Sequence, residues 1–424
     1  MDIFLLSSFI LLLTTLYFNK KKAIAVYIKK SLLPLMGIFF IAALILYPKV
    51  AVASASKGIQ LWLEIVFPSL FPFFVASQLL SKSGMVNIFG IILEPVMRPL
   101  FNVPGCGSFA LAMGIISGYP VGASITSDLR KQDLLTKTEA ERLLTFTNNS
   151  GPLFIMGAVA VGMFKLPQAG YLLYLSHVAA CITVGLIFKY YKKESTKSMK
   201  AHIKMSHKLK TELIKYRNED ANVWTLFGEC IKNAVSTILA IGGFIIFFSV
   251  LINVMIASGF IGWVCSLVPD MIYAAGIGPK TLEGIFCGIF EITTGSNLIN
   301  LSSGNLLLKL CCASLIIGWA GLSVHTQVMS IVSSSDIGVK PYIAGKALQG
   351  ILSAIYTFIG YQLFSKWLPE EAPAFANASP EYVNNWGSLL KMSVQNIVMI
   401  ALFMTIVSLS YICISKAFSG KKLF

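Results

Sequence analysis

Charged residues are scarce in this sequence, and acidic residues are the scarcest of them. Asp, Glu, Lys and Arg make up 12% of the 424 residues, whereas hydrophobic residues make up 56%. A soluble protein is usually about 25% charged, so this chain has too little charge to coat a soluble surface. The apolar residues suffice for about a dozen helices of roughly 20 residues. Apolar runs such as Ile38–Leu46 do not alternate as the strands of a β-barrel would. Composition therefore predicts an all-α polytopic membrane protein.

Catalytic and metal-binding signatures are also missing. The sequence has no P-loop, no GxSxG, no HExxH and no CxxC motif. Its four histidines and eight cysteines form no close cluster of metal-ligating residues. The sequence thus predicts no catalytic residue, no metal and no cofactor, and the chain is not expected to be an enzyme.

The net charge of +15 is better explained by membrane topology than by nucleic-acid binding. Lysines and arginines concentrate in residues 19–30, in 192–222 and in the C-terminal tail, whereas the loop 366–387 is acidic. Basic loops stay on the cytoplasmic side. We therefore expect the N-terminus outside, with 3–18 an uncleaved anchor, and the C-terminus inside. The lipid bilayer is the expected surrounding, and nucleic acid is not an expected partner.

Thirteen candidate spans fit between these basic anchors. For segments 58–80 and 280–299, the sequence does not decide between a full crossing and a re-entrant or interfacial path. The short polar loop around 128–142 is expected to be solvated. The spans are 3–18, 32–52, 58–80, 85–103, 105–127, 143–164, 168–190, 230–256, 260–277, 280–299, 305–332, 342–364 and 388–415.

The central spans divide around the basic loop into two sets of five that run in opposite directions. This is the pattern of an inverted-topology repeat. The predicted fold is thus two inverted repeats with broken helices or re-entrant hairpins, plus flanking transmembrane helices. The predicted units are N-terminal helices 1–57, a first repeat 58–191, a basic linker 192–229, a second repeat 230–365, an outside loop 366–387, and a C-terminal helix with a basic tail 388–424.

Four motifs place helix-breaking and polar residues at membrane depth. Gly114–Gly122 and Asn148–Pro152 lie in the third and fourth elements of the first set, and Gly288–Asn297 and Trp319–Gln327 lie in those of the second. Unwound backbone survives in a membrane only where protein or water satisfies it, so four breaks predict one central substrate cavity. The candidate substrate-binding residues are Gly118, Tyr119, Gly122, Asn148, Asn149, Ser150, Gly151, Thr293, Thr294, Gly295, Ser296, Asn297, Trp319, Ser323 and Gln327.

Two titratable side chains are candidates for coupling to an ion or a proton. Glu291 lies in an otherwise apolar stretch, where a carboxylate is costly and usually functional. A structural hydrogen bond remains the alternative for Glu291, and hydrogen bonding between helices is the equal alternative to ligand contact for Asn148 and Asn149. His325 follows in the fourth element and can titrate near neutral pH. His177 lies in a plain apolar helix, which favours an ordinary core histidine.

The four motifs together resemble a known family. Ser117–Ala123, Asn148–Pro152, Glu291–Gly295 and Trp319–Gln327 are similar to the YlbJ-type sporulation integral membrane proteins, whose repeated unit is the nucleoside-recognition or gate domain. The resemblance covers about residues 58–365. It implies a multi-pass protein of the mother-cell-derived outer forespore membrane that moves dipicolinate, a small organic anion, from the mother cell toward the forespore.

The resemblance also implies roles for individual residues. Half-helix N-termini with Asn148 and Asn149 would hold the carboxylates of a flat aromatic dianion, and Tyr119 or Trp319 would stack on its ring. Glu291 would bind a coupling proton or sodium ion. A nucleoside or ion carrier, a sporulation scaffold acting through 192–222 and, last, a membrane enzyme remain the alternatives. The sequence leaves a homo-oligomer open.

Overall fold

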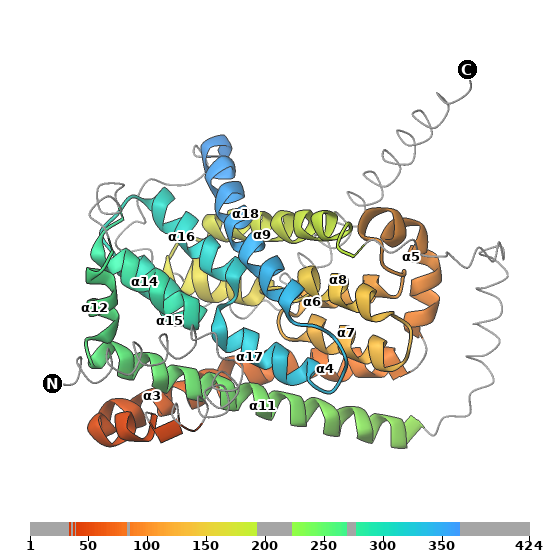
Figure 1. The fold of residues 1–424 in the computed structure, drawn as a ribbon, viewed down its shortest axis with the longest axis horizontal. Helices are drawn as coiled ribbons and strands as arrows, with labels where there is room; N and C mark the ends of the chain where they lie inside the picture. The colour runs from red at the N-terminus through yellow and green to blue at the C-terminus, as the bar shows by residue number, and fades with distance from the viewer. Residues whose placement is uncertain are drawn as a thin grey trace, which may run out of the picture.

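The structure, a computed structural model, describes residues 34, 37–38, 40–82, 85–192, 223–268 and 277–364. Their regular secondary structure is entirely helical (Figure 1). Four of the described helices are long and apolar enough to cross a membrane, or five if one bent pair counts as a span. The prediction of an all-α polytopic membrane protein is confirmed. The four are α9 (Pro167–Phe188), α11 (Val223–Ala257), the pair α16 (Leu306–Trp319) and α17 (Gly321–Val332), and α18 (Lys340–Phe364).

The N-terminal part of the described chain breaks at a different place from the expected one. The helical segments Phe40–Leu46 and Pro48–Glu64 meet at an angle of 108°. Pro48 explains the position of the break, because proline starts a helix well but disrupts its interior. The expected boundary between spans 32–52 and 58–80 is therefore wrong. The chain stays helical through α3 (Pro48–Leu61), η1 (Trp62–Val66) and α4 (Phe67–Lys82).

Segment 105–127 folds back on itself instead of crossing once. It forms α6 (Gly107–Ile116) and α7 (Val121–Lys131), which pack against each other. Gly118 turns the chain between them with a φ of +91°, a conformation that glycine adopts without strain. A helix of 10 residues is about 15 Å long, half the hydrocarbon thickness of a bilayer. The expected single crossing is therefore wrong, and the segment is a hairpin.

Segment 280–299 forms the second hairpin. Helices α14 (Pro279–Phe290) and α15 (Ile292–Leu301) meet at Glu291 and pack tightly along their length. At the open end the Thr281 hydroxyl donates to the Ser302 hydroxyl over 2.8 Å. The two alternatives for this segment are thus resolved in favour of a hairpin.

Each hairpin tip packs on a break in the helix pair that follows it. In the first half, α8 (Lys137–Thr147) and η2 (Leu153–Met163) are separated by residues 148–151. A Cβ atom added at Gly118 would lie 2.7 Å from the backbone nitrogen of Gly151. In the second half, α16 and α17 are separated at Ala320, and a Cβ added at Gly321 would lie 3.0 Å from the Phe290 carbonyl oxygen.

The two halves therefore share the order hairpin, broken pair, long helix. Each half also contacts the other in an equivalent way. The second helix of each hairpin packs on the second helix of the other half's broken pair, α7 on α17 and α15 on η2, and the long helices α9 and α18 contact each other. Figure 1 shows the α14–α15 hairpin and the α6–α7 hairpin on opposite sides, with α18 running between them. This arrangement supports two related repeats. Their inverted orientation in the bilayer stays a prediction.

Two expected crossings form no helix in the described chain that is long and apolar enough to span. Segment 85–103 forms α5 (Met85–Phe101), which carries Glu94, Arg98 and two internal prolines. In segment 260–277 the described part forms only the seven-residue helix α12 (Phe260–Ser266). Neither is among the described helices that could cross a membrane, so a crossing by α5 is not supported, and the crossing at 260–277 stays a prediction. Residues 269–276 lie outside the described chain.

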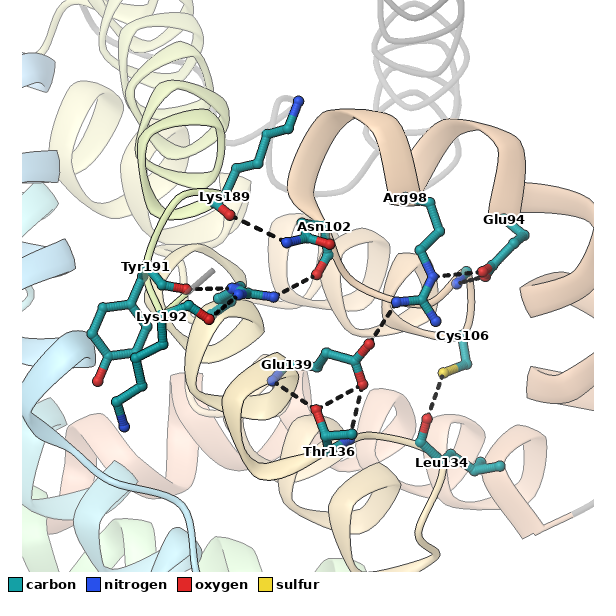
Figure 2. Close-up of polar contacts among 12 residues, drawn as sticks. Glu94, Arg98, Asn102, Cys106, Leu134, Thr136, Glu139, Lys189, Tyr191 and Lys192 are labelled. Atoms are coloured by element: carbon teal, nitrogen blue, oxygen red, sulfur yellow. Dashed lines mark hydrogen bonds and ion pairs between the residues drawn. The ribbon is translucent and has the colours of Figure 1, made fainter. Parts of the chain in front are cut away.

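The expectation of a solvated loop at 128–142 is confirmed for Lys131–Lys137, where Lys131, Asp133 and Lys137 are exposed, but it is wrong for Glu139, Glu141 and Arg142, which are buried. Figure 2 shows Arg98 between Glu94 and Glu139, with Nε–Oε1 and Nη1–Oε1 distances of 2.7 and 2.5 Å. Arg142 is 4% exposed and satisfies carbonyls that end neighbouring helices and turns. Its guanidinium donates to the carbonyl oxygens of Asn102, Tyr191 and Lys192.

The same end of the molecule holds a contact between the halves. The Arg130 guanidinium at the end of α7 pairs with Asp336, which follows α17, at an Nε–Oδ1 distance of 2.8 Å. Because this guanidinium bonds the carboxylate, the pKa of Asp336 is lowered from its ordinary value. The backbone nitrogen of Gly338 donates to Glu141 on α8. These contacts tie α7 and α8 to the connection between α17 and α18.

Several predicted segments lie outside the described residues. They are the span 3–18, nearly all of the basic linker, the outside loop 366–387, the span 388–415 and the basic tail.

Candidate functional site

The break after α8 carries two asparagines that reach into the second half. Asn148 and Asn149 are buried. Asn148 ends α8, and its Nδ2 donates to the Tyr342 hydroxyl over 3.0 Å. Asn149 Oδ1 accepts from Gln349 Nε2 over 2.9 Å, while its Nδ2 donates to the Phe146 carbonyl. Both side chains therefore connect the first break to α18.

His177 of α9 joins this network. The backbone nitrogen of Ser150 donates to His177 Nε2 over 3.1 Å, and Gln349 Nε2 lies 3.3 Å from the same ring nitrogen. His177 is 1% exposed, and its Nδ1 has no partner among the described residues. His177 is therefore a buried core histidine as expected, but only one of its ring nitrogens is satisfied, by polar groups of the first break and of α18.

A polar stripe on α18 completes the network. Five polar side chains recur at helical spacing along one buried face of this helix. Lys346 is the only ionisable amine among them, and its Nζ donates to the Asn148 carbonyl oxygen over 3.0 Å and to Gln349 Oε1 over 2.8 Å. Within the described residues no carboxylate lies within salt-bridge distance of Lys346. The five are Tyr342, Lys346, Gln349, Ser353 and Thr357, each 0% exposed.

The second-half break contributes His325 and Trp319. His325 Nδ1 lies 3.1 Å from the Tyr342 hydroxyl, so His325 is linked through Tyr342 to Asn148. The Trp319 ring meets the His325 ring edge-on at a centroid distance of 4.3 Å. Trp319 Nε1 donates to the Ile289 carbonyl near the tip of the second hairpin. Both predicted breaks thus meet in one connected polar network.

Two aromatic side chains mark the outer edge of this network. The Tyr119 hydroxyl, at the tip of the first hairpin, lies 3.3 Å from Ser150 Oγ. Tyr119 and Trp319 are half-buried, in contrast to the buried residues Asn148, Asn149 and Lys346.

Glu291 caps a helix at the tip of the second hairpin. It is the N-cap of α15, and its two carboxylate oxygens accept from the backbone nitrogens of Thr293 and Thr294, each over 2.7 Å. A carboxylate at this position satisfies orphan N–H groups and complements the positive end of the helix dipole. Glu291 is half-buried. The alternative of a structural hydrogen bond is therefore observed, while the coupling role stays a prediction.

The remaining candidate residues fall into two groups. The glycines act through their backbones: Gly118 packs on Gly151, Gly122 on Thr147, and Gly295 on Gly288. The other candidates lie outside the network. Among these, Thr293 and Thr294 bond Glu291 through their backbones, Ser296 is buried, Asn297 is exposed, and Ser323 and Gln327 lie on α17.

Gln327 faces a groove between α17 and α11. Its volume is about 170 Å³, and it is separate from the asparagines of the first break. The groove is lined by Ser236, Thr237, Ala240, Ile241, Phe244, Gln327, Ser330 and Ile331.

Sequence reasoning missed the most unusual residue of the network. Lys346 and Gln349 lie in a segment predicted only as a span, and Tyr342 marks its start. The signal that finds them is the recurrence of polar residues at positions i, i+4, i+7, i+11 and i+15 in an otherwise apolar helix. A lysine inside such a stripe is a functional-site candidate by the same reasoning that singled out Glu291.

Comparisons with known proteins identify the family of this chain. The family described as "Gate: Nucleoside recognition" matches residues 63–188. The chain is 36% identical over 389 residues to the sporulation integral membrane protein YlbJ of Bacillus subtilis (strain 168), which covers 88% of this chain and 94% of that relative. No solved structure matches. The chain belongs to the family of YlbJ-type sporulation integral membrane proteins.

Proposed function

We propose that this protein is a transporter or facilitator for a small organic anion, and that the anion is dipicolinate moving from the mother cell toward the forespore. The family membership supports a membrane protein of sporulation. The observation that carries the choice of an anion is Lys346, a fully buried lysine whose amine bonds only neutral groups in the described chain. A buried charge without an opposite charge is costly. An anionic ligand would supply that opposite charge.

The proposed path runs between the two broken helices. Tyr119 and Trp319 would stack on the flat ring of the anion as it enters, and Asn148 and Asn149 would offer amide groups to its carboxylates. Since Lys346 is closed off from solvent, a hairpin or a repeat must move to admit the substrate. Alternating access of one repeat against the other accomplishes this in transporters built from inverted repeats.

Coupling and location follow from the same proposal. Glu291 would bind a proton or a sodium ion at the second hairpin's tip, and His325 would respond through its contact with Tyr342. The protein would lie in the outer forespore membrane, which derives from the mother cell. A homo-oligomer is compatible with this function and is not needed for it.

The test is uptake of labelled dipicolinate by cells that produce this protein. We expect uptake above that of cells without it, and no saturable uptake of labelled uridine. The comparison with uridine is needed because the matching family is described as nucleoside recognition. Uridine uptake without dipicolinate uptake would support a nucleoside carrier and overturn the proposal.

A scaffold role is separated by deleting residues 193–222. A scaffold that recruits sporulation partners through this basic segment would lose its function. A carrier should retain dipicolinate uptake, because the segment lies between the two repeats in the sequence. Loss of sporulation with normal dipicolinate uptake would favour the scaffold.

A further inference from the structure

The buried network has more hydrogen-bond donors than acceptors. An ammonium group has three N–H donors, and Lys346 has two acceptors in the described chain, the Asn148 carbonyl oxygen and Gln349 Oε1. When Lys346 is protonated, one of its three donors is therefore unmatched. A buried donor without a partner costs free energy until an acceptor arrives.

The hydrogen bonds of His177 assign the proton on its ring. His177 Nε2 accepts from the backbone nitrogen of Ser150 and faces the amide of Gln349. The proton of a neutral His177 is therefore on Nδ1. His177 Nδ1 has no partner among the described residues, so it is a second unmatched donor.

The same reasoning applies to His325. The Tyr342 hydroxyl accepts from Asn148 Nδ2, so its own proton is available for His325 Nδ1, 3.1 Å away, and we assign the proton to that bond. The proton of a neutral His325 is therefore on Nε2, which has no partner in the described chain. Besides these donors, two further atoms of the network have no partner in the described chain: Asn148 Oδ1, which can only accept, and the Ser353 hydroxyl, which can donate or accept.

We infer that Lys346 is the counter-ion of a substrate carboxylate, with Gln349 and the two histidines as its neutral partners in substrate selection. This rests on the proposed function and names the residue that makes it selective for carboxylates. Lys346 would give its ammonium to the carboxylate, and the unmatched histidine N–H groups would bond the substrate's remaining oxygens. Glu291 is excluded from direct contact with the anion, because like charges repel and its oxygens are held by backbone nitrogens.

A purely structural lysine is the competing explanation. Lys346 bonds the last carbonyl of α8, where a cation is favourable. Its replacement by methionine separates the two roles. A structural lysine predicts a less stable ligand-free protein. A substrate counter-ion predicts equal or greater stability, because a buried charge has been replaced by an apolar chain of similar length.

The experiment uses the full chain purified in detergent, with dipicolinate and its neutral diamide, pyridine-2,6-dicarboxamide, as probes. Binding and the ligand-induced shift of Tm are measured for wild type, Lys346→Met, Lys346→Arg and Lys309→Met. Lys309 is a matched control, since it also lies in a membrane helix and donates to a backbone carbonyl, that of Asn300.

We expect wild type and Lys309→Met to bind dipicolinate and to prefer it to the diamide. Lys346→Met should bind dipicolinate about 10- to 100-fold more weakly, lose the preference and keep the ligand-free Tm. Lys346→Arg should retain part of the preference, because it keeps the charge. Equal binding by wild type and Lys346→Met overturns this inference and leaves the proposed function intact. So does a Lys346→Met protein with a lower Tm and unchanged preference. A wild-type protein that binds no dipicolinate overturns the proposed function and this inference together.

Discussion

The ammonium of Lys346 donates to the carbonyl oxygen of Asn148, 3.0 Å away, at the residue where α8 ends. Lys346 belongs to the second half of the molecule and Asn148 to the first. The contact therefore joins a charge on α18 to the broken helix of the other half. Any movement that separates the halves at this point must break the contact or replace it. A substrate carboxylate is one group that could replace it, and the predictions below follow from this relationship and from the two hairpins.

Replacing Gln349 by Glu should place a permanent counter-ion beside Lys346. Gln349 Oε1 already accepts from Lys346 over 2.8 Å, so the carboxylate of Gln349→Glu would occupy nearly the same space. We expect dipicolinate uptake to be lost, because an internal carboxylate competes for the ammonium. Uptake by cells and the dipicolinate-induced shift of Tm both measure this.

The control for Gln349→Glu is the double variant with Lys346→Met. If Gln349→Glu fails because its carboxylate occupies the substrate's place beside Lys346, adding Lys346→Met should not restore uptake. The double variant should then have a lower ligand-free Tm than Gln349→Glu alone. That double variant leaves a buried carboxylate without its partner. Normal dipicolinate uptake by Gln349→Glu alone would contradict the prediction.

Replacing Glu291 by Gln should uncouple transport from its driving gradient. Glu291 holds the tip of the α14–α15 hairpin through two backbone nitrogens. Binding of a proton or cation would weaken this cap and loosen the tip, and glutamine imitates the neutral form with one acceptor fewer. We expect Glu291→Gln to take up dipicolinate slowly and without response to an imposed pH or sodium gradient.

Glu291→Ala removes the cap entirely. It should lower the free energy of unfolding by about 1 kcal/mol, the typical value of an N-cap, and abolish uptake while the protein still accumulates in the membrane. If the Glu291→Gln protein responds to both gradients as wild type does, Glu291 has no coupling role and serves only as the N-cap of α15.

Replacing Gly118 by Ala should disrupt the first hairpin. Its φ of +91° is unfavourable for alanine by about 1–2 kcal/mol, and the new Cβ would lie 2.7 Å from the Gly151 nitrogen. We expect a clear fall in Tm together with loss of uptake. Gly243→Ala is the matched control, because a Cβ at Gly243 meets nothing within 4 Å on helix α11. Its Tm should be unchanged or higher, since alanine favours helix more than glycine. A Gly118→Ala protein as stable as Gly243→Ala would contradict the packing described here.

The sequence predicts the breaks well because a break has a local cause. A helix end in an apolar segment is predicted by glycine or by polar side chains at that point, here by Gly118, Asn148, Asn149 and Glu291. The sequence does not predict what the chain does after a break. The α6–α7 hairpin and a single crossing have the same apolar composition, and only the contact of α6 with α7 distinguishes them.

The network itself depends on contacts between distant residues. Asn148 and Lys346 are 198 positions apart, so neither predicts the other. Arg142 is a second case in which the sequence does not predict the contacts of a residue. Its sequence surroundings are polar, yet it is buried because carbonyl groups of three other residues converge on it.

The contact of Arg130 with Asp336 should make a pH-dependent contribution to stability. The folded-state pKa of Asp336 is lowered by the Arg130 guanidinium. Its contribution is therefore fully present above the ordinary carboxyl pKa of about 4 and is lost as the pH falls through the lower folded value. Wild type should have a slightly higher Tm than Asp336→Asn at pH 7, and the difference should vanish only in strong acid. The effect should be small, because both side chains are partly exposed.

Asp133→Asn is the control for this measurement. Asp133 also pairs with Arg130, but its side chain is 88% exposed, so its removal should have no measurable effect on Tm at any pH. A Tm difference between wild type and Asp336→Asn that grows as the pH falls would have the wrong sign for this pair.

The two hairpins should open toward opposite sides of the membrane. If α6–α7 is re-entrant, Asn102 before it and Lys131 at its end lie on one side. The basic residues around that hairpin place this side in the cytoplasm. If the second half is inverted, Lys280 and Ser303 at the open end of α14–α15 share the outer side. Single cysteines at these four positions, in a protein without its native cysteines, test this through labelling by an impermeant thiol reagent.

We expect the reagent added to intact cells to label positions 280 and 303, and to label 102 and 131 only after the membrane is opened. Two continuous crossings would instead place the two ends of each segment on opposite sides. Labelling of all four positions from one side would mean that both hairpins open in the same direction. The halves would then be related by a parallel repeat, and access from the two sides would need a movement other than the exchange of two inverted halves. The labelling pattern thus decides whether the contact of Lys346 with Asn148 lies at the pivot of an inverted pair.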